Sequence, residues 1–399
     1  MAHPTIPVPC PHCGRRPGIH AALTAIIQTL RALAFDHLLT GWRRLAFCSA
    51  IAGLLVVQHG AAAVRVARAI PGVSHDHLTR LLHERDLPTC LMAALRHCAS
   101  GLPPAIWIID DVIVPKPAMR TLAWAKGLWC PAEKRYVHAI NIVVLLACWG
   151  PLRIPLGFRL WCPKECVTGY APGYSYRTKL LLARDLVAEA WGDGLRCQYV
   201  TFDTWYTARA LTSYLSALDI TWYGAIGANH VVVMQGQRLR VDALGRQLHD
   251  WTARRIDRVV AGADIYSPRL GQVRLTRVRI SQPKRPYLYL VTNQRECTPS
   301  QAWACKVSRW PIEPMFRDEK QLLDLAGCQS PRVEAQETHI ALVLVAWVVL
   351  QCLRQAPSQT TGEVRAELIA TVWGHETRFS PPVSDSLSTA SVIQGVQMP

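Results

Sequence analysis

The order of apolar segments between residues 105 and 226 constrains the fold of this chain more than any other feature. Three short apolar runs come first, and two further apolar runs then alternate with two amphipathic segments. The apolar runs span 105–114, 136–148, 152–161, 197–202 and 220–226, and the amphipathic segments span 178–191 and 207–218. Three strands followed by helix, strand, helix and strand predict an α/β fold, with a mixed sheet and helices on its faces.

The segments on either side of this region differ from it in pattern. Apolar residues recur at helical spacing before Pro103-Pro104, and a stretch rich in Val, Arg and Gly follows residue 228. The predicted regions are a helical N-terminal region (1–100), the first part of an α/β core (101–228), a basic β-rich insertion (229–289), core helices with a break near Pro331 (290–355) and a flexible tail rich in Pro, Ser and Thr (356–399).

The charge of the chain is concentrated in the insertion. The 399 residues carry 44 Lys and Arg against 28 Asp and Glu, a net charge of +16. Residues 229–289 alone hold 12 basic and 4 acidic side chains, a net +8, and nearly all the basic ones are Arg. Such a surface favours a polyanionic partner, either nucleic acid or an anionic membrane. Since half of the chain is hydrophobic and 18% is charged, a largely disordered protein is excluded.

The apolar windows and the cysteines indicate an intracellular protein. The two most apolar windows, 45–57 and 340–352, are shorter than the roughly 20 residues of a membrane span, so we predict buried helices and no membrane partner. No secretory pattern follows Met1, so we expect reduced thiols and a cytoplasmic location. Cys10 and Cys13 form one C-x-x-C pair, for which zinc binding and ordinary thiols both remain open.

A possible DNA-binding motif lies in the N-terminal region. A helical pattern over 61–70, a turn at Pro71-Gly72-Val73 and a helix over 75–83 capped by Ser74 have the form of a helix-turn-helix. The second helix would present His75, His77, Arg80 and His83. Two ordinary packed helices would show the same pattern, so both interpretations stand.

Acidic residues interrupt or follow two of the predicted strands. Asp110 and Asp111 lie inside an apolar run, where a charge is costly unless it is paired or bound to a cation. Strand alternation directs these two side chains to opposite faces. Asp203 directly follows the apolar run 197–202, at the kind of strand end where ligands collect in α/β sheets. The alternatives are a shorter, solvated first strand and a helix-capping role for Asp203.

A third acidic residue, Glu313, begins a predicted helix. If Pro311 is the first helical residue, it falls with Pro314 in the first turn, where no backbone hydrogen bond is lost. The helix N-terminus favours a charged Glu313, and Arg317 and Lys320 lie one and two turns further on. A plain Glu313–Arg317 pair is the alternative interpretation. Glu319, elsewhere on the helix, is the alternative acid.

The three acidic positions together indicate a chemistry. Two Asp on neighbouring strands and a Glu on a later helix can hold two Mg²⁺ or Mn²⁺ ions, which oxygen ligands suit. Such a pair of ions promotes phosphoryl transfer, and the basic chain favours DNA as the substrate.

The residues around Glu313 resemble those of a known family. Arg309-x3-Glu313-x6-Lys320 is similar to the Tyr-x2-Arg-x3-Glu-x6-Lys signature of DDE transposases from bacterial insertion sequences, in the branch with a β-rich insertion. Lys306 stands where that branch has Tyr. Val112 stands where the family's first strand has Thr, two residues after its catalytic Asp. The likeness covers residues 106–353.

The resemblance implies an RNase H-like fold and a set of roles. Asp110, Asp203 and Glu313 would be the catalytic residues and the ligands of two Mg²⁺ or Mn²⁺ ions. Asp111 is the second choice for the first Asp, and otherwise it would support these ligands without binding the ions. The residues expected to bind DNA are Lys306, Arg309, Arg317 and Lys320. The protein would bind the terminal inverted repeats as a homodimer, cut the ends and join the 3′-OH groups to target DNA. The alternative is an inactive DNA-binding regulator derived from a transposase.

Overall fold

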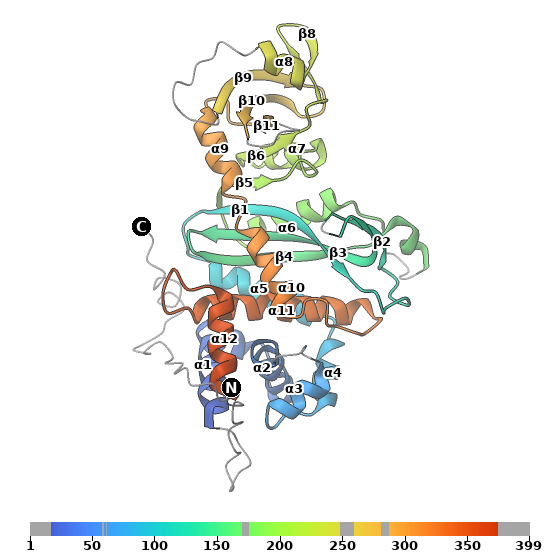
Figure 1. Cartoon of the computed structure of the whole chain (residues 1–399), viewed down its shortest axis with the longest axis vertical. Helices are drawn as coiled ribbons and strands as arrows, with labels where there is room; N and C mark the ends of the chain where they lie inside the picture. The colour runs from blue at the N-terminus through green and yellow to red at the C-terminus, as the bar shows by residue number, and fades with distance from the viewer. Residues whose placement is uncertain are drawn as a thin grey trace, which may run out of the picture.

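A computed structural model describes residues 17–57, 60, 62–131, 133–169, 175–247, 259–280 and 287–373. Figure 1 shows the insertion at one end of the molecule, a helical region at the other end, and strands of the large sheet between them. Cys10, Cys13 and the last part of the predicted tail lie outside the described residues, so the zinc hypothesis stays a prediction.

Eleven strands of the described chain form one mixed sheet. Their bounds are Ala105–Pro115 (β1), Lys126–Cys130 (β2), Arg135–Trp149 (β3), Leu152–Trp161 (β4), Cys197–Phe202 (β5), Trp222–Ile226 (β6), Val231–Met234 (β7), Gln237–Arg240 (β8), Val259–Ser267 (β9), Gly271–Arg279 (β10) and Tyr287–Thr292 (β11).

The centre of the sheet has the strand order β4-β3-β1-β5-β6. β3 pairs antiparallel with both β4 and β1, whereas β5 runs parallel to β1 and to β6. This arrangement of three antiparallel strands followed by two parallel ones is RNase H-like, as predicted. The apolar runs on which the prediction depended form β1, β3, β4, β5 and β6, which confirms the α/β fold class.

The insertion extends this sheet rather than forming a separate one. β11 pairs antiparallel with β6, and the order then continues through β10, β9, β7 and β8. The described part of the insertion is β-rich, as predicted, with one short helix, α8. The core strands and the insertion strands therefore share one network of backbone hydrogen bonds.

Helices lie against the central strands and fill the opposite end of the molecule (Figure 1). Of those close to the sheet, α6 contacts β3 and β4, α5 and α11 contact β4, and α10 contacts β1. The helices are Pro17–Ala32 (α1), Gly41–Val56 (α2), Ala63–Ala69 (α3), His75–Leu82 (α4), Leu87–Ala99 (α5), Lys179–Gly192 (α6), Arg209–Ala217 (α7), Val241–Gln247 (α8), Pro299–Val307 (α9), Ile312–Gln321 (α10), Val333–Cys352 (α11) and Thr361–Trp373 (α12), with 3-10 turns at Phe35–His37 (η1) and Lys164–Gly169 (η2).

The predicted helix-turn-helix corresponds to α3 and α4. Gly72 in the turn has a φ of 86°, a conformation that favours glycine, and the Ser74 hydroxyl caps α4 by accepting a hydrogen bond from the His77 backbone N–H. Arg80 lies over the ring of Trp42, 4.4 Å from its centroid. His75 and Arg80 are exposed, whereas His77 and His83, also expected to be exposed, are half-buried.

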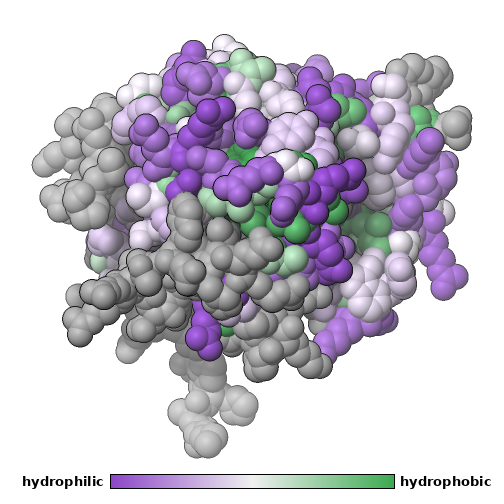
Figure 2. Space-filling model, turned by 90° about the horizontal axis from the view of Figure 1, so that it is seen from above, coloured by the Kyte–Doolittle hydropathy of each residue, from purple (hydrophilic) through white to green (hydrophobic). Residues whose placement is uncertain are grey.

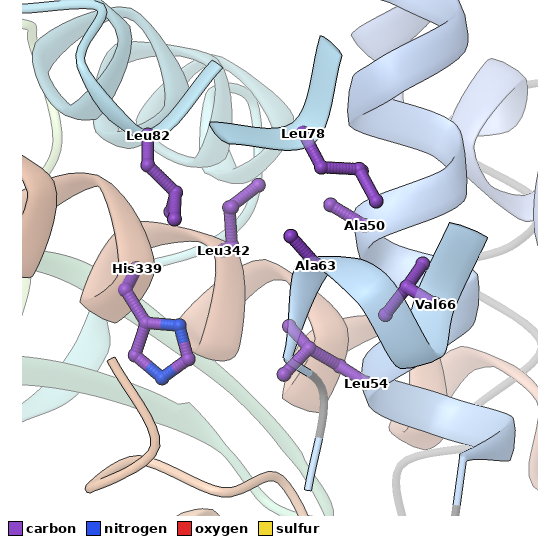
Figure 3. A pocket seen from close by; sticks show the side chains of 8 residues that line it. All are labelled: Ala50, Leu54, Ala63, Val66, Leu78, Leu82, His339 and Leu342. Carbon is purple, nitrogen blue, oxygen red and sulfur yellow. The ribbon is translucent and has the colours of Figure 1, made fainter. Parts of the chain in front are cut away.

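α3 and α4 are not detached from the rest of the chain. A small cavity of about 40 Å³ lies between α2, α3, α4 and α11, and Leu78, Leu82, His339 and Leu342 point toward it (Figure 3). Buried apolar residues from the N-terminal helices, the sheet, α11 and α12 belong to one continuous core.

Two elements differ from the sequence-based expectation. β2 was not predicted, because Lys126–Cys130 is short and lies on the edge of the sheet, where no apolar run is needed. The tail was expected to be loosely ordered from residue 356. It instead contains α12, whose Val364, Leu368 and Val372 are buried against the other helices.

The longest apolar helix is part of the protein core. α11 is the one described helix with the length and composition of a membrane span, and 89% of its most apolar window is buried inside the fold. The expected burial of residues 340–352 is thereby confirmed. The same holds for α2, which is buried over most of residues 46–56.

Candidate active site

Asp110 and Asp203 lie side by side on neighbouring parallel strands. β1 and β5 pair in parallel with Ile109 opposite Phe202, so the next residue on each strand brings the two aspartates into register. β5 ends at Phe202, so Asp203 lies at the carboxyl end of that strand, where ligands collect in α/β sheets. β1 continues to Pro115 in its pairing with β3 and carries Asp110 at mid-strand. The fold therefore joins two carboxylates that are more than ninety residues apart in the sequence.

Asp110 is largely shielded from solvent and lies among other charged side chains. Burial raises the pKa of Asp110 to about 7 against the opposing effect of the Arg309 guanidinium, and the nearby Asp203 carboxylate raises it further. An ion pair joins Arg309 to Asp110, and a second one joins Arg309 Nη2 to Glu313 Oε1 at 2.5 Å. Arg309 thus lies between the first and third predicted acids.

The position of Glu313 follows from the turn that precedes its helix. Pro311 is the N-terminal flanking residue of α10, and Pro314 is the third helical residue, so both prolines fall where no helical hydrogen bond is lost. Glu313 is exposed in the first turn of the helix. Its partner four residues away is Arg309, not Arg317, so the alternative Glu313–Arg317 pair is wrong.

The Asp203 carboxylate orders the loop after β5. Its Oδ1 accepts hydrogen bonds from the backbone N–H groups of Trp205 (2.9 Å) and Tyr206 (3.2 Å). The Thr207 hydroxyl donates to the Asp203 carbonyl oxygen at 2.9 Å. The capping interpretation of Asp203 is wrong, because α7 begins at Arg209 with Ala208 as its N-cap and has no side-chain cap. The Asp203 carboxylate instead orders the loop before α7 while it lies beside Asp110.

Asp111 faces away from Asp110, as strand alternation predicted. Its carboxylate accepts hydrogen bonds from Tyr206 Oη (3.0 Å), Asn141 Nδ2 (2.5 Å) and Lys179 Nζ (2.8 Å). Tyr206 follows Asp203 in the chain, so the contact ties the loop after β5 to β1. Sequence reasoning missed Asn141, Lys179 and Tyr206, since no local pattern links residues from β3, α6 and the loop.

The predicted basic residues occupy two different places. Lys306 is near the acids, because the carboxylates of Asp203, Asp110 and Glu313 all act on its ammonium group; burial and Arg309 lower its pKa nevertheless. Lys320 lies further along α10 and lines a small cavity with Asp324 and Arg365.

Arg317 and Glu319 do not join the carboxylates. Arg317 is exposed and contacts Asp318. Glu319, the alternative acid, is 1% exposed, and burial raises its pKa well above the ordinary value. Because its side chain is buried inside the fold, Glu319 is not placed to replace the exposed Glu313.

The chemistry of this site fits divalent cations at two of its three acids. Asp110 and Asp203 place two carboxylates together, and carboxylate oxygens are the ligands that such cations prefer. Burial is the main cause of the raised pKa of Asp110, and the Asp203 carboxylate adds to it although Arg309 opposes it. Within the part of the chain that the structure describes, no three acidic, His or Cys side chains are grouped closely enough to hold a metal ion. Glu313 is separated from the pair by Arg309, so its participation requires that this guanidinium move.

Comparison with known protein families agrees with this geometry. The family described as DDE superfamily endonuclease matches residues 35–258, more than half of the chain. Asp110 and Asp203 lie inside the matched region and Glu313 lies beyond it. No curated protein is significantly similar to the chain. Because the match covers most of the core that carries both aspartates, the chain belongs to the DDE superfamily endonucleases, transposase-like nucleases that act on DNA.

Proposed function

We propose that this protein is the transposase of a bacterial insertion sequence, from the branch with the Tyr-Arg-Glu-Lys signature. It would bind the terminal inverted repeats, cut DNA at the element ends and join the 3′-OH ends to target DNA. The observation that carries the proposal is the in-register pair Asp110 and Asp203, joined to Glu313 through Arg309. A net charge of +16 suits the DNA substrate.

The roles of the acids follow from their positions. Asp110 and Asp203, with Glu313 once Arg309 has moved, would hold two Mg²⁺ or Mn²⁺ ions. Such ions, when bound, activate the attacking oxygen and stabilise the leaving oxygen in phosphoryl transfer. Asp111 acts at a distance: by binding Tyr206 it keeps the loop that carries Asp203 against β1.

The basic residues of the site would bind the DNA. Arg309 exchanges its carboxylate partners for a phosphate near the cut, where a planar guanidinium can bind two oxygens. Lys306 supplies a second cation beside the acids, in the place of the signature Tyr. Arg317 and Lys320 lie further along α10, where they would contact phosphates away from the cut.

The remaining parts of the proposal concern the whole protein. The exposed His75 and Arg80 on α4 suit an element that contacts the DNA ends, with α3 as the supporting helix. Bringing two ends together requires two copies of the chain, hence a homodimer. The reaction would take place in the bacterial cytoplasm, at the nucleoid.

One observation favours a second candidate function, a catalytically inactive DNA-binding regulator. Among the described residues the three acids do not form a ready metal site, and Arg309 lies between two of them. If Arg309 stays in place when DNA binds, the protein would bind DNA without cutting it.

Cleavage of labelled DNA that carries the element ends distinguishes the two functions. We expect nicking at the ends with Mg²⁺ or Mn²⁺ and none with EDTA. Asp203→Asn keeps an acceptor for the Trp205 and Tyr206 N–H groups but removes the charge, and it should lower cleavage by about 10³-fold or more. Asp264→Asn, at an exposed position in β9, is the matched control. Binding without cleavage by the unaltered protein would favour the regulator.

A further inference from the structure

A second polar site lies directly beside Asp203. A groove of about 800 Å³ opens where β5 and β6 end, and Thr204, the residue after Asp203, is part of its wall. The N-terminus of α7, the start of the β7–β8 hairpin and the turn between β9 and β10 form the other walls. The groove therefore connects the candidate active site with the insertion.

Three arginines from three different walls line this groove. Arg209 comes from α7, Arg238 from β8 and Arg269 from the β9–β10 turn. All three are exposed, none of the residues that line the groove is acidic, and no ion pair joins these arginines to an acidic side chain within the described ranges. The neighbouring Arg240 and Arg274, in contrast, pair with Asp242 and Asp264. The groove thus concentrates uncompensated positive charge.

The walls are held in place by hydrogen bonds that leave the guanidinium groups unused. His230 Nε2 lies 2.9 Å from the Ser267 hydroxyl, which ties the start of β7 to the β9–β10 turn. The same hydroxyl accepts hydrogen bonds from the backbone N–H groups of Arg269 and Leu270. Burial, followed by the nearby Arg269, lowers the pKa of His230. Arg269 is consequently presented by an ordered turn.

The helix end in the groove wall and the scarcity of large aromatic rings define the ligand further. α7 begins without a side-chain cap, and its N-terminal residues Ala208 and Arg209 line the groove, so the positive end of this helix belongs to the groove wall. No Phe, Tyr or Trp of the described chain lines the groove, and the one imidazole, His230, is held against the Ser267 hydroxyl, so the groove offers bases little stacking surface. Repeated phosphates satisfy both conditions, because arginines and helix N-termini bind them and need no base contact. Figure 2, a view onto the insertion end, shows strongly hydrophilic side chains over much of the described surface.

We propose that this groove binds the phosphodiester backbone of the DNA strand that flanks the cut, without regard to its sequence. The strand would pass from Asp203 over Thr204 and the start of α7 and then between Arg238 and Arg269. This inference rests on the proposed function for the position of the cut. Contact with the phosphates does not depend on cleavage.

DNA binding in EDTA, measured by fluorescence anisotropy across a range of salt concentrations, tests the groove alone. Two probes of arbitrary sequence are used, a labelled duplex and a labelled single strand. A variant with Arg209→Gln, Arg238→Gln and Arg269→Gln should bind the form that the groove holds at least tenfold more weakly at moderate salt. Each lost phosphate contact lowers the slope of log K against log salt by about 0.9 for a duplex and about 0.7 for a single strand. The slope should therefore fall by between about 2 and 3. The probe, duplex or single strand, with which this fall is seen shows which form of DNA the groove holds.

Arg240→Gln is the matched control. Arg240 lies on β8 two residues from Arg238, but it pairs with Asp242 and does not line the groove. This control should bind both probes as the unaltered protein does, and all variants should keep the same melting temperature. An unchanged salt slope in the triple variant, or an equal loss in Arg240→Gln, would overturn the proposal.

The outcome is separable from that of the proposed function. Loss of binding in the triple variant of a protein that never cuts DNA would support the groove and reject the transposase. Cleavage by the unaltered protein, together with full binding by the triple variant, would reject the groove alone.

Discussion

At the scale of single residues, Arg309 sets the charge balance of the candidate active site. It is the shared partner of Asp110 and Glu313, and it opposes the rise in the pKa of Asp110 that burial causes. A guanidinium in this position does part of what a divalent cation would do. Arg309 and a metal ion should therefore compete for the same carboxylates.

We predict that Arg309→Gln makes the protein more responsive to metal. Without the guanidinium, the repulsion between Asp110 and Asp203 is less compensated, so the metal-free variant should melt at a lower temperature. Mn²⁺ should then raise its melting temperature by at least about 2 °C more than that of the unaltered protein, corresponding to about 1 kcal/mol. Arg317→Gln, which removes an exposed cation from α10, the helix that follows Arg309, should behave as the unaltered protein does. Equal increases in all three proteins would argue against competition.

Two titratable residues on α11 have opposite effects on acid stability. His339 is buried, with Nε2 2.8 Å from the Asp324 carbonyl oxygen, and burial lowers its pKa to about 4, with a smaller effect from Lys116. Burial raises the pKa of Glu337 to about 7, against the opposing charge of Arg159. Between pH 6.5 and 4 His339 is protonated in the unfolded chain but not in the folded one. The free energy of unfolding therefore falls as the pH falls through this range. Between pH 7 and 4.5 the folded chain keeps the Glu337 proton more tightly, so stability rises as pH falls.

Substitution of each residue should reveal these opposite slopes. On going from pH 7 to pH 4.5, His339→Gln should lose about 2 to 3 kcal/mol less unfolding free energy than the unaltered protein. Glu337→Gln should lose more than the unaltered protein does. Urea denaturation at the two pH values measures both changes. A shift in the same direction for both variants would show that at least one of the two pKa directions is wrong.

At the scale of elements, the contact between α2 and α3 depends on one missing side chain. A Cβ added to Gly53 in α2 would lie 2.5 Å from a methyl group of the buried Val66 in α3. We predict that Gly53→Ala destabilises the protein by about 1 kcal/mol, because crowding of about 1 to 3 kcal/mol exceeds the gain in helix propensity. Gly192→Ala is the control, since the space around Gly192 at the end of α6 is open. It should be neutral or slightly stabilising in thermal denaturation, and equal losses in both would contradict the crowding argument.

The elements show which sequence patterns were informative. Long apolar runs predicted β1, β3, β4 and β5, because a strand buried on both faces excludes polar residues along its length. β2 and α12 have no such pattern. The edge strand β2 is half-exposed, and α12 follows a segment of loop-like composition, so only its packing in three dimensions identifies it as part of the core.

The candidate site was predictable to a similar extent. Alternation placed Asp110 and Asp111 on opposite faces, which their separate partners confirm. The spacing around Glu313 indicated a third acid, which stays a prediction, and it could not show that Arg309 would contact the acids. The groove was not predictable at all, since its arginines are distant in sequence and converge only after the insertion has folded against the core.

At the scale of the whole molecule, the shared core makes the two ends of the chain interdependent. Buried residues of the N-terminal helices, α11 and α12 belong to the same core as the sheet, so the proposed DNA-contacting helix α4 is supported by the segment that follows Glu313. Any movement of α4 upon binding DNA would therefore be transmitted to α11. The core strands β1 and β5 are joined to the insertion by one continuous sheet.

The continuous sheet also affects how far from the cut the protein contacts the DNA. Because β5, β6, β11, β10 and β9 are hydrogen-bonded neighbours, the separation between the Asp203 carboxylate and the Arg269 turn is fixed by backbone geometry and not by a hinge. A strand held at both points would be protected at a constant number of nucleotides from the cut, whatever its sequence. Hydroxyl-radical footprints on unrelated flanking sequences should therefore superimpose when they are aligned at the cut. The hydrogen-bonded strands of the sheet would set a constant distance between the cut and the protected phosphates.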